Sequence, residues 1–216
     1  MASELDLSTI EAWARAELDR RNAVRERVLG WSRELIRTCA TCVRSVHRRE
    51  FERAAALLQE ARALNGQITR TVGDLGEIYW AGYVQDAQKE LVEASVTYAL
   101  IRGEALPSPA ELGAAPGPFL NGLAEAVGEL RRYVLDRLRR GEVDGCEPLL
   151  ACMDDIYALL VTLDYPDALT GGLRRTTDAT RGILEKTRGD LTLALRQESL
   201  ARALAVQWPG RAGPVV

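Results

Sequence analysis

The sequence predicts an all-α protein, a single-domain bundle of six or seven helices. Three observations predict this fold class. Apolar residues recur every three or four positions along most of the chain, which is the period of an amphipathic helix. No segment shows the alternation of apolar and polar residues that a half-buried strand requires. The 216 residues, 47% of them hydrophobic, are enough for one well-buried domain.

The first predicted helix spans residues 5–49. Ser8 and Glu11 form a candidate capping box near its start, because a serine side chain can bond the backbone three residues later while the acid reaches back. The helix carries an apolar stripe at helical spacing, which we expect to face the core. Its members are Val28, Trp31, Leu35, Cys39, Cys42 and Val46.

The second predicted helix spans residues 49–64 and ends at Asn65-Gly66, a common helix stop. Gly73 and Gly76 then mark a break in the chain. The third predicted helix spans residues 78–102.

Residues 106–109 and 113–118 form the longest irregular stretch. Pro118 suits the first turn of the next helix, since a proline there removes no helical hydrogen bond. That helix is predicted to run to Arg140 and stop at Gly141.

A further core helix is predicted over residues 146–163, broken by Tyr165-Pro166. The last helix spans residues 172–206. We therefore expect one helical domain over residues 1–206 and a flexible tail over residues 207–216, which contains two prolines.

The charge balance excludes a basic nucleic-acid coat, because 28 Lys and Arg face 31 Asp and Glu for a net charge of −3. Any RNA binding must come from a local basic surface. One candidate surface lies opposite the apolar stripe of the first helix, where four arginines fall within about 60° of each other. Such a face can be a solvated helix surface or can follow a phosphate backbone. Its residues are Arg33, Arg37, Arg44 and Arg48.

No apolar run of 18 residues occurs, and no apolar segment follows a basic start, so we expect a cytoplasmic protein with no membrane partner. Of the four cysteines, Cys39 and Cys42 form a C-x-x-C on the apolar stripe. The pair could bind zinc with His47, the single histidine, or could serve as small buried hydrophobes.

Two glutamates interrupt the apolar third helix. Glu90 and Glu93 lie about 60° apart on one helical face, with Asp86 and Thr97 on the same strip. From Leu91 to residue 101 the only charged side chain is Glu93. An unpaired buried carboxylate is strongly unfavourable, so the pair requires a cation, a metal ion or a hydrated cavity nearby.

A second acidic pair lies on the following helix. Glu125 and Glu129 are one turn apart, about 40° from each other, with the small residues Gly122, Ala126 and Gly128 beside them. If the two helices pack antiparallel, four carboxylates can converge, and an all-oxygen cluster suits Mg²⁺ or Mn²⁺. The apolar residues lie on the opposite side: Leu120, Leu123, Val127, Leu130, Val134 and Leu138.

These motifs carry a resemblance to the translin family, specifically to subunits like translin-associated factor X. The matching segments are ELVEA, with Glu90 and Glu93, and GLAEAVGEL, with Glu125 and Glu129. The resemblance covers nearly the whole chain and includes WSRELIR (31–37), VHRR (46–49), GEALPS (103–108), YPDALTGGLRR (165–175) and EKTRGDLTLA (185–194), which are similar to archaeal and bacterial members.

The resemblance implies a Mg²⁺- or Mn²⁺-dependent endoribonuclease in a closed homo-oligomer, an octamer, with interior active sites. The four glutamates would be its metal-binding and catalytic residues. RNA would be its partner, and single-stranded DNA is a further candidate ligand. Two departures stand out: Glu125 replaces a frequent aspartate, and residues 78–83 lack the Arg/His cluster of eukaryotic translin subunits.

Other interpretations of the acidic residues stay open. The i,i+3 and i,i+4 acids can simply be solvated helix faces. An all-α nucleoside triphosphate pyrophosphatase also has E-x-x-E, but its second pair is normally E-x-x-D, whereas this chain has E-x-x-x-E. A diiron bundle is disfavoured because His47 is the single histidine. A non-catalytic scaffold that binds RNA or single-stranded DNA is the third alternative.

Overall fold

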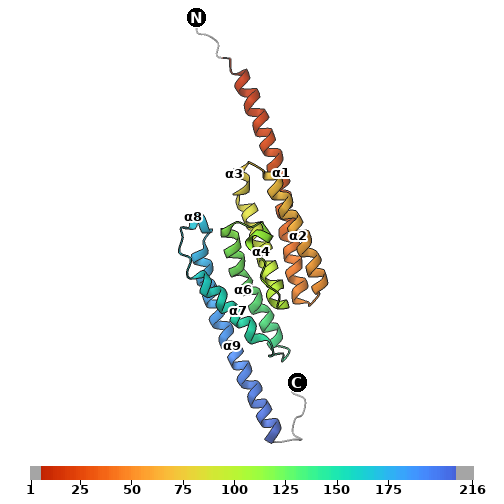
Figure 1. Ribbon diagram of the computed structural model, residues 1–216, viewed down its shortest axis with the longest axis vertical. Helices are drawn as coiled ribbons and strands as arrows, with labels where there is room; N and C mark the ends of the chain where they lie inside the picture. Colours follow the sequence, from red (N-terminus) through yellow and green to blue (C-terminus); the bar gives the residue numbers. More distant parts are fainter. Residues whose placement is uncertain (1–5, 208–216) are drawn as a thin grey trace. The chain divides into compact units, whose positions relative to one another are not determined.

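A computed structural model describes residues 6–207 and confirms an all-α fold, with no strand in that range (Figure 1). Three of its helices, α3, α5 and α8, are single turns of four residues each, and the longer ones are those that the sequence predicts. The helices are α1 (Ser8–His47), α2 (Phe51–Val72), α3 (Gly76–Tyr79), α4 (Gly82–Arg102), α5 (Pro109–Leu112), α6 (Pro116–Leu138), α7 (Cys146–Leu160), α8 (Asp167–Thr170) and α9 (Leu173–Gln207).

The chain divides into two compact units, which the long helix α4 joins. Unit 1 contains the chain up to Ser95 and Pro107–Phe119, and therefore α1, α2, α3, α5 and most of α4. Unit 2 contains Val96–Leu106 and the chain from Leu120, with most of α6 and all of α7, α8 and α9. Of the predicted tail over residues 207–216, Gln207 is the last residue of α9 and residues 208–216 lie outside the described residues.

In unit 1, α2 packs against the second half of α1, where the buried residues of α1 lie (Figure 1). The predicted stripe of α1 is confirmed, because all of its members except the partly buried Trp31 are buried. From α2 the buried residues recur at the same spacing, which makes one apolar seam between the two helices. They include Ala54, Leu58, Ala61, Leu64 and Ile68.

The predicted helix stop at Asn65-Gly66 is wrong, since α2 continues through both residues to Val72. The physical reason is a long-range contact. Asn65 is buried, and its Nδ2 donates hydrogen bonds to the carbonyl oxygens of Leu112, at 2.8 Å, and Gly113, at 3.3 Å. The Asn65 side chain therefore connects α2 to the chain at Leu112 and Gly113 within unit 1, and it does not end the helix. The helix stops at Gly73, whose φ of 54° favours glycine.

The predicted capping box at Ser8 and Glu11 is also wrong. The N-cap of α1 is Leu7, which makes no side-chain cap bond, and the backbone N–H of Ser8 donates to the Asp6 carboxylate at 3.0 Å. A capping box forms instead at α5, where Ser108 and Glu111 bond each other's backbone N–H groups. The motif recurs easily in sequence, but it needs the serine in an extended conformation before the helix, as at Ser108.

The acidic helix begins later than predicted, because residues 76–79 form the separate turn α3 and α4 starts at Gly82. Gln88 anchors α4 within unit 1. Its buried side chain accepts a hydrogen bond from the N–H of Ala115 at 3.2 Å and donates to the carbonyl of Gly113 at 3.3 Å. The loop before α6 is thereby fixed to the turn of α4 that precedes the first acidic pair.

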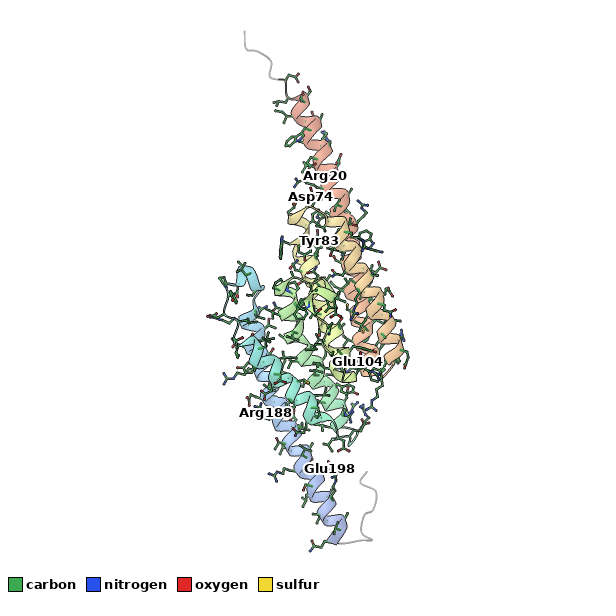
Figure 2. The ribbon with its side chains drawn as sticks, in the orientation of Figure 1. Arg20, Asp74, Tyr83, Glu104, Arg188 and Glu198 are labelled. Carbon is green, nitrogen blue, oxygen red and sulfur yellow. The ribbon has the colours of Figure 1, made fainter. Side chains whose placement is uncertain are left out.

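In unit 2, α7 packs against α9. Met153, Ile156 and Leu160 of α7 are buried, as are Leu184 and Leu191 of α9. An ion pair at the surface connects the two helices, with Arg188 Nη2 2.9 Å from Asp154 Oδ2; Figure 2 labels Arg188.

The chain between α6, α8 and α9 is held by one buried amide. Asn121 donates from Nδ2 to the carbonyl of Thr170 at 2.6 Å and accepts from the hydroxyl of Thr176 at 2.8 Å. Further along α6, Arg131 Nη2 lies 2.8 Å from Asp190 Oδ2 of α9. Within the described residues, no helix is long and apolar enough to cross a membrane.

We predict that Asn65→Ala lowers the free energy of unfolding by about 1–3 kcal/mol, because it leaves the buried carbonyl of Leu112 without this donor. Urea unfolding followed by circular dichroism measures the change. Asn22→Ala, at an exposed position of α1, is the matched control and should change stability by no more than about 0.5 kcal/mol. Equal effects of the two substitutions would contradict the packing role of Asn65.

Candidate metal centre

The first acidic pair lies on α4, as the spacing predicts. Glu90 and Glu93 are half-buried, whereas the adjacent Leu91 and Val92 are fully buried. One carboxylate oxygen of Glu90 and one of Glu93 lie within 4.8 Å of each other. The helix thus holds two carboxylates close enough to share a cation at the edge of an apolar interior.

Positive charge near this pair comes from the same helix. Lys89 Nζ lies 3.8 Å from Glu90 Oε1, and both side chains are about a quarter exposed, at 24% and 28%. At 3.8 Å the two atoms are farther apart than in a charge-assisted hydrogen bond, so the pair contributes little stability. The lysine therefore offsets only part of the charge of two carboxylates.

The C-x-x-C of α1 lies near the pair but does not behave as a zinc site. Burial raises the pKa of the Cys39 thiol, and Cys42, Glu90 and Glu93 raise it further. Burial likewise raises the pKa of Cys42 to about 12, and its Sγ donates to the carbonyl of Ala54 at 3.5 Å. Burial thus disfavours the thiolate forms that zinc binds. The structure favours the alternative in which they are small buried hydrophobes.

The second acidic pair lies on α6, one turn apart. Glu125 and Glu129 are both half-buried. Arg132 Nη1 lies 3.6 Å from Glu129 Oε2, and the Glu129 side chain is 23% exposed. The apolar side of α6 is confirmed, since Leu123, Val127, Leu130 and Val134 are buried and Leu120 and Leu138 are half-buried.

The small residues beside the second pair serve helix packing. Gly122 and Ala126 are buried. A methyl group added at Gly128 would lie 4.0 Å from Ile183 Cδ1 of α9, which is ordinary van der Waals contact. Gly128 therefore leaves room for a methyl group, with Ile183 of α9 just beyond it.

The donor chemistry of the two pairs fits a hard divalent cation. All four ligand groups are carboxylates, none is fully exposed, and Mg²⁺ and Mn²⁺ prefer oxygen ligands. Lys89 and Arg132 are neighbours that the sequence analysis missed, although adjacency to Glu90 and i,i+3 spacing from Glu129 could have indicated them. The convergence of the two pairs on one ion stays a prediction.

The four arginines are all exposed; Arg33, Arg37 and Arg44 lie on α1, and Arg48 is its C-cap residue. One of them, Arg44, donates from Nη2 to the hydroxyl of Thr41 at 2.8 Å. Their exposure is what both a solvated face and a phosphate-binding face require. In the segment that lacks the family's Arg/His cluster, Trp80 is 63% exposed and its ring meets that of Tyr79 edge to face at 5.0 Å.

The fold and its acidic helices define the class of the molecule: an all-α protein with a carboxylate pair on each of two helices. No protein-family model matches the chain. An uncharacterized protein of Methanocaldococcus jannaschii is 31% identical over 192 residues, which cover 87% of this chain and 83% of that protein.

Solved structures are similar over most of the chain. AfC3PO, from Archaeoglobus, is 34% identical in its complex with duplex RNA, with a TM-score of 0.81 over 86% of this chain and 96% of that one. A second AfC3PO structure is 33% identical, with a TM-score of 0.79 over 86% and 97%. NeC3PO without ligand, from Nematostella, shows the same fold at 19% identity, with a TM-score of 0.77 over 88% and 100%. The chain belongs to the translin family.

Proposed function

We propose that this chain is a Mg²⁺- or Mn²⁺-dependent endoribonuclease that cleaves single-stranded RNA. The observation that carries the proposal is the half-buried pair Glu90 and Glu93 in the otherwise apolar helix α4 of a translin-family chain. The AfC3PO complex with duplex RNA, at 34% identity, supports RNA as the class of ligand.

In the proposed site Glu90 and Glu93 of α4 and Glu125 and Glu129 of α6 would be the metal ligands, because all four are half-buried carboxylates. A bound divalent ion would polarise the scissile phosphodiester and lower the pKa of the attacking water. The carboxylates would hold the ion, and one of them that is not fully engaged would accept a proton from the attacking water. The buried apolar side chains around the first pair limit access of bulk water, which strengthens each charge interaction.

Contact with the RNA backbone is assigned to the exposed arginine face of α1, because a chain of net charge −3 needs a local basic surface. Arginine suits this role, since its planar fork matches the oxygens of a phosphate. The same face would accept single-stranded DNA. Binding of this kind weakens as salt rises. The face consists of Arg33, Arg37, Arg44 and Arg48.

A second candidate function is a non-catalytic RNA-binding scaffold, which the RNA complex of AfC3PO equally favours. A preparation that binds RNA in the presence of Mg²⁺ or Mn²⁺, and leaves it intact, would favour the scaffold. A single assay of binding and cleavage on single-stranded and duplex RNA therefore separates the two functions.

We predict that Glu90→Gln, Glu93→Gln, Glu125→Gln and Glu129→Gln each abolish RNA cleavage and leave the helical circular dichroism spectrum unchanged. Each substitution keeps the size of the side chain and removes a ligand charge. Glu104→Gln, at an exposed acid shortly after α4, is the control and should cleave like the wild type. Near wild-type cleavage by one of the four variants would remove that residue from the site.

We also predict that millimolar Mn²⁺ or Mg²⁺ raises the melting temperature of the wild type. An ion that binds only the folded state stabilises it by about 2.7 kcal/mol at a hundredfold excess over Kd. The double variant Glu93→Gln/Glu129→Gln should respond much less, and the response of the wild type should shrink at low pH, where carboxylates are protonated and release metal. Identical responses of both proteins would identify the glutamates as a solvated acidic face.

A closed homo-oligomer, an octamer with interior active sites, completes the proposal. Large apolar side chains are exposed at several places within the described residues, which supports association, and three of these places are named here. Trp80 is one. The second is the first half of α1, with Ile10, Trp13 and Leu18, and the third is the end of α9, with Leu193 and Leu200.

For the oligomer, light scattering at micromolar concentration should give a mass near eight times 23.8 kDa. The association should depend on apolar contacts, so Trp13→Glu should lower the mass, whereas Arg15→Glu at a neighbouring exposed position should not. A monomeric wild type would contradict the enclosed arrangement.

A further inference from the structure

Thr97 lies on the acidic strip of α4 but has no part in the proposed chemistry. At about 100° per residue its direction falls between those of Glu90 and Glu93. It follows Glu93 by four residues, the spacing at which helical side chains meet. Because helical side chains tilt toward the N-terminus, Thr97 leans over the turn that carries Glu93.

The hydroxyl of Thr97 is fully buried, and it has no hydrogen-bond partner among the described residues. Other helical threonines of this chain donate to the carbonyl four residues earlier. Examples are Thr41, Thr69, Thr177, Thr180, Thr187 and Thr192. An unpaired buried hydroxyl is unfavourable, so its retention on this strip points to a partner in another state of the site.

We propose that Thr97 is a positioning residue for the metal-binding state of the site. Its hydroxyl donates a hydrogen bond to the Glu93 carboxylate oxygen that does not hold the ion, and this fixes the rotamer of that ligand. The role presupposes the proposed metal site. Hydrogen bonds of this kind commonly orient metal-binding carboxylates. Since Thr97 is fully buried, it acts through Glu93 and does not touch RNA.

Ser95 offers a matched control on the same helix. Its hydroxyl is also buried and without a partner, and it is 2% exposed. It points about 160° away from Thr97 around the helix, so it does not lie on the acidic strip. Substitution of either residue removes a buried hydroxyl that has no hydrogen-bond partner, but only substitution of Thr97 can affect the position of Glu93.

The experiment is calorimetric titration of the metal-free protein with MnCl₂, together with the melting temperature of the metal-free protein. We expect Thr97→Val to weaken Mn²⁺ binding by about 10- to 100-fold. Thr97→Ser should restore near wild-type affinity because it keeps the hydroxyl, and Ser95→Ala should leave affinity unchanged. The melting temperature of metal-free Thr97→Val should equal or exceed that of the wild type, since the substitution preserves shape and removes an unpaired group.

Wild-type affinity in Thr97→Val would overturn the inference, and so would a failure of Thr97→Ser to restore binding. A lower melting temperature of metal-free Thr97→Val would show a structural hydrogen bond instead, and would also overturn it. Glu93→Gln separates this inference from the proposed function. If Glu93→Gln loses Mn²⁺ and Thr97→Val does not, the metal site stands without Thr97. If the wild type itself binds no Mn²⁺, both fail.

Discussion

The proposed metal site depends on the position of two carboxylates in an apolar helix. One carboxylate oxygen of Glu90 and one of Glu93 lie within 4.8 Å of each other, next to fully buried side chains of α4. Like charges at this separation repel, and partial burial strengthens the repulsion because the local dielectric is lower than that of water. Lys89 compensates one of them in part. Binding of a divalent cation would turn this unfavourable arrangement into a favourable one.

The surroundings keep this arrangement in place. In unit 1, Gln88 fixes the loop at Gly113 and Ala115 to α4, and Asn65 fixes the same loop to α2. Both amides are buried, and both donate to the carbonyl of Gly113. The acidic pair of α4 therefore lies on a helix whose position depends on polar contacts as well as on apolar packing.

Much of the fold could be predicted from the sequence, because its signal is local. The period of apolar residues predicted the longer helices and the buried stripe of α1. Asn65-Gly66 was misinterpreted for the opposite reason: the partners of Asn65 are more than 45 residues away in sequence, at Leu112 and Gly113, and no local pattern indicates them. The capping box predicted at Ser8 does not form, because the motif alone does not determine the residue at which the helix begins.

In the candidate site, too, local spacing could be predicted from the sequence and long-range packing could not. The helical spacing of each glutamate pair follows from the sequence, whereas the half-burial of its members is a finding of the structure. The unpaired hydroxyl of Thr97 and the effect of Glu90 and Glu93 on Cys39 depend on packing in three dimensions, and no spacing rule predicts them.

Diffraction from crystals grown with Mn²⁺ tests the central claim most directly, because the anomalous signal locates the ion. The account predicts a peak about 2.0–2.6 Å from carboxylate oxygens of Glu90, Glu93 and Glu125. Loss of that peak in Glu93→Gln crystals would confirm the assignment of the ligands. A wild-type crystal that binds Mn²⁺ elsewhere, with these carboxylates in contact only with water or arginine, would contradict it.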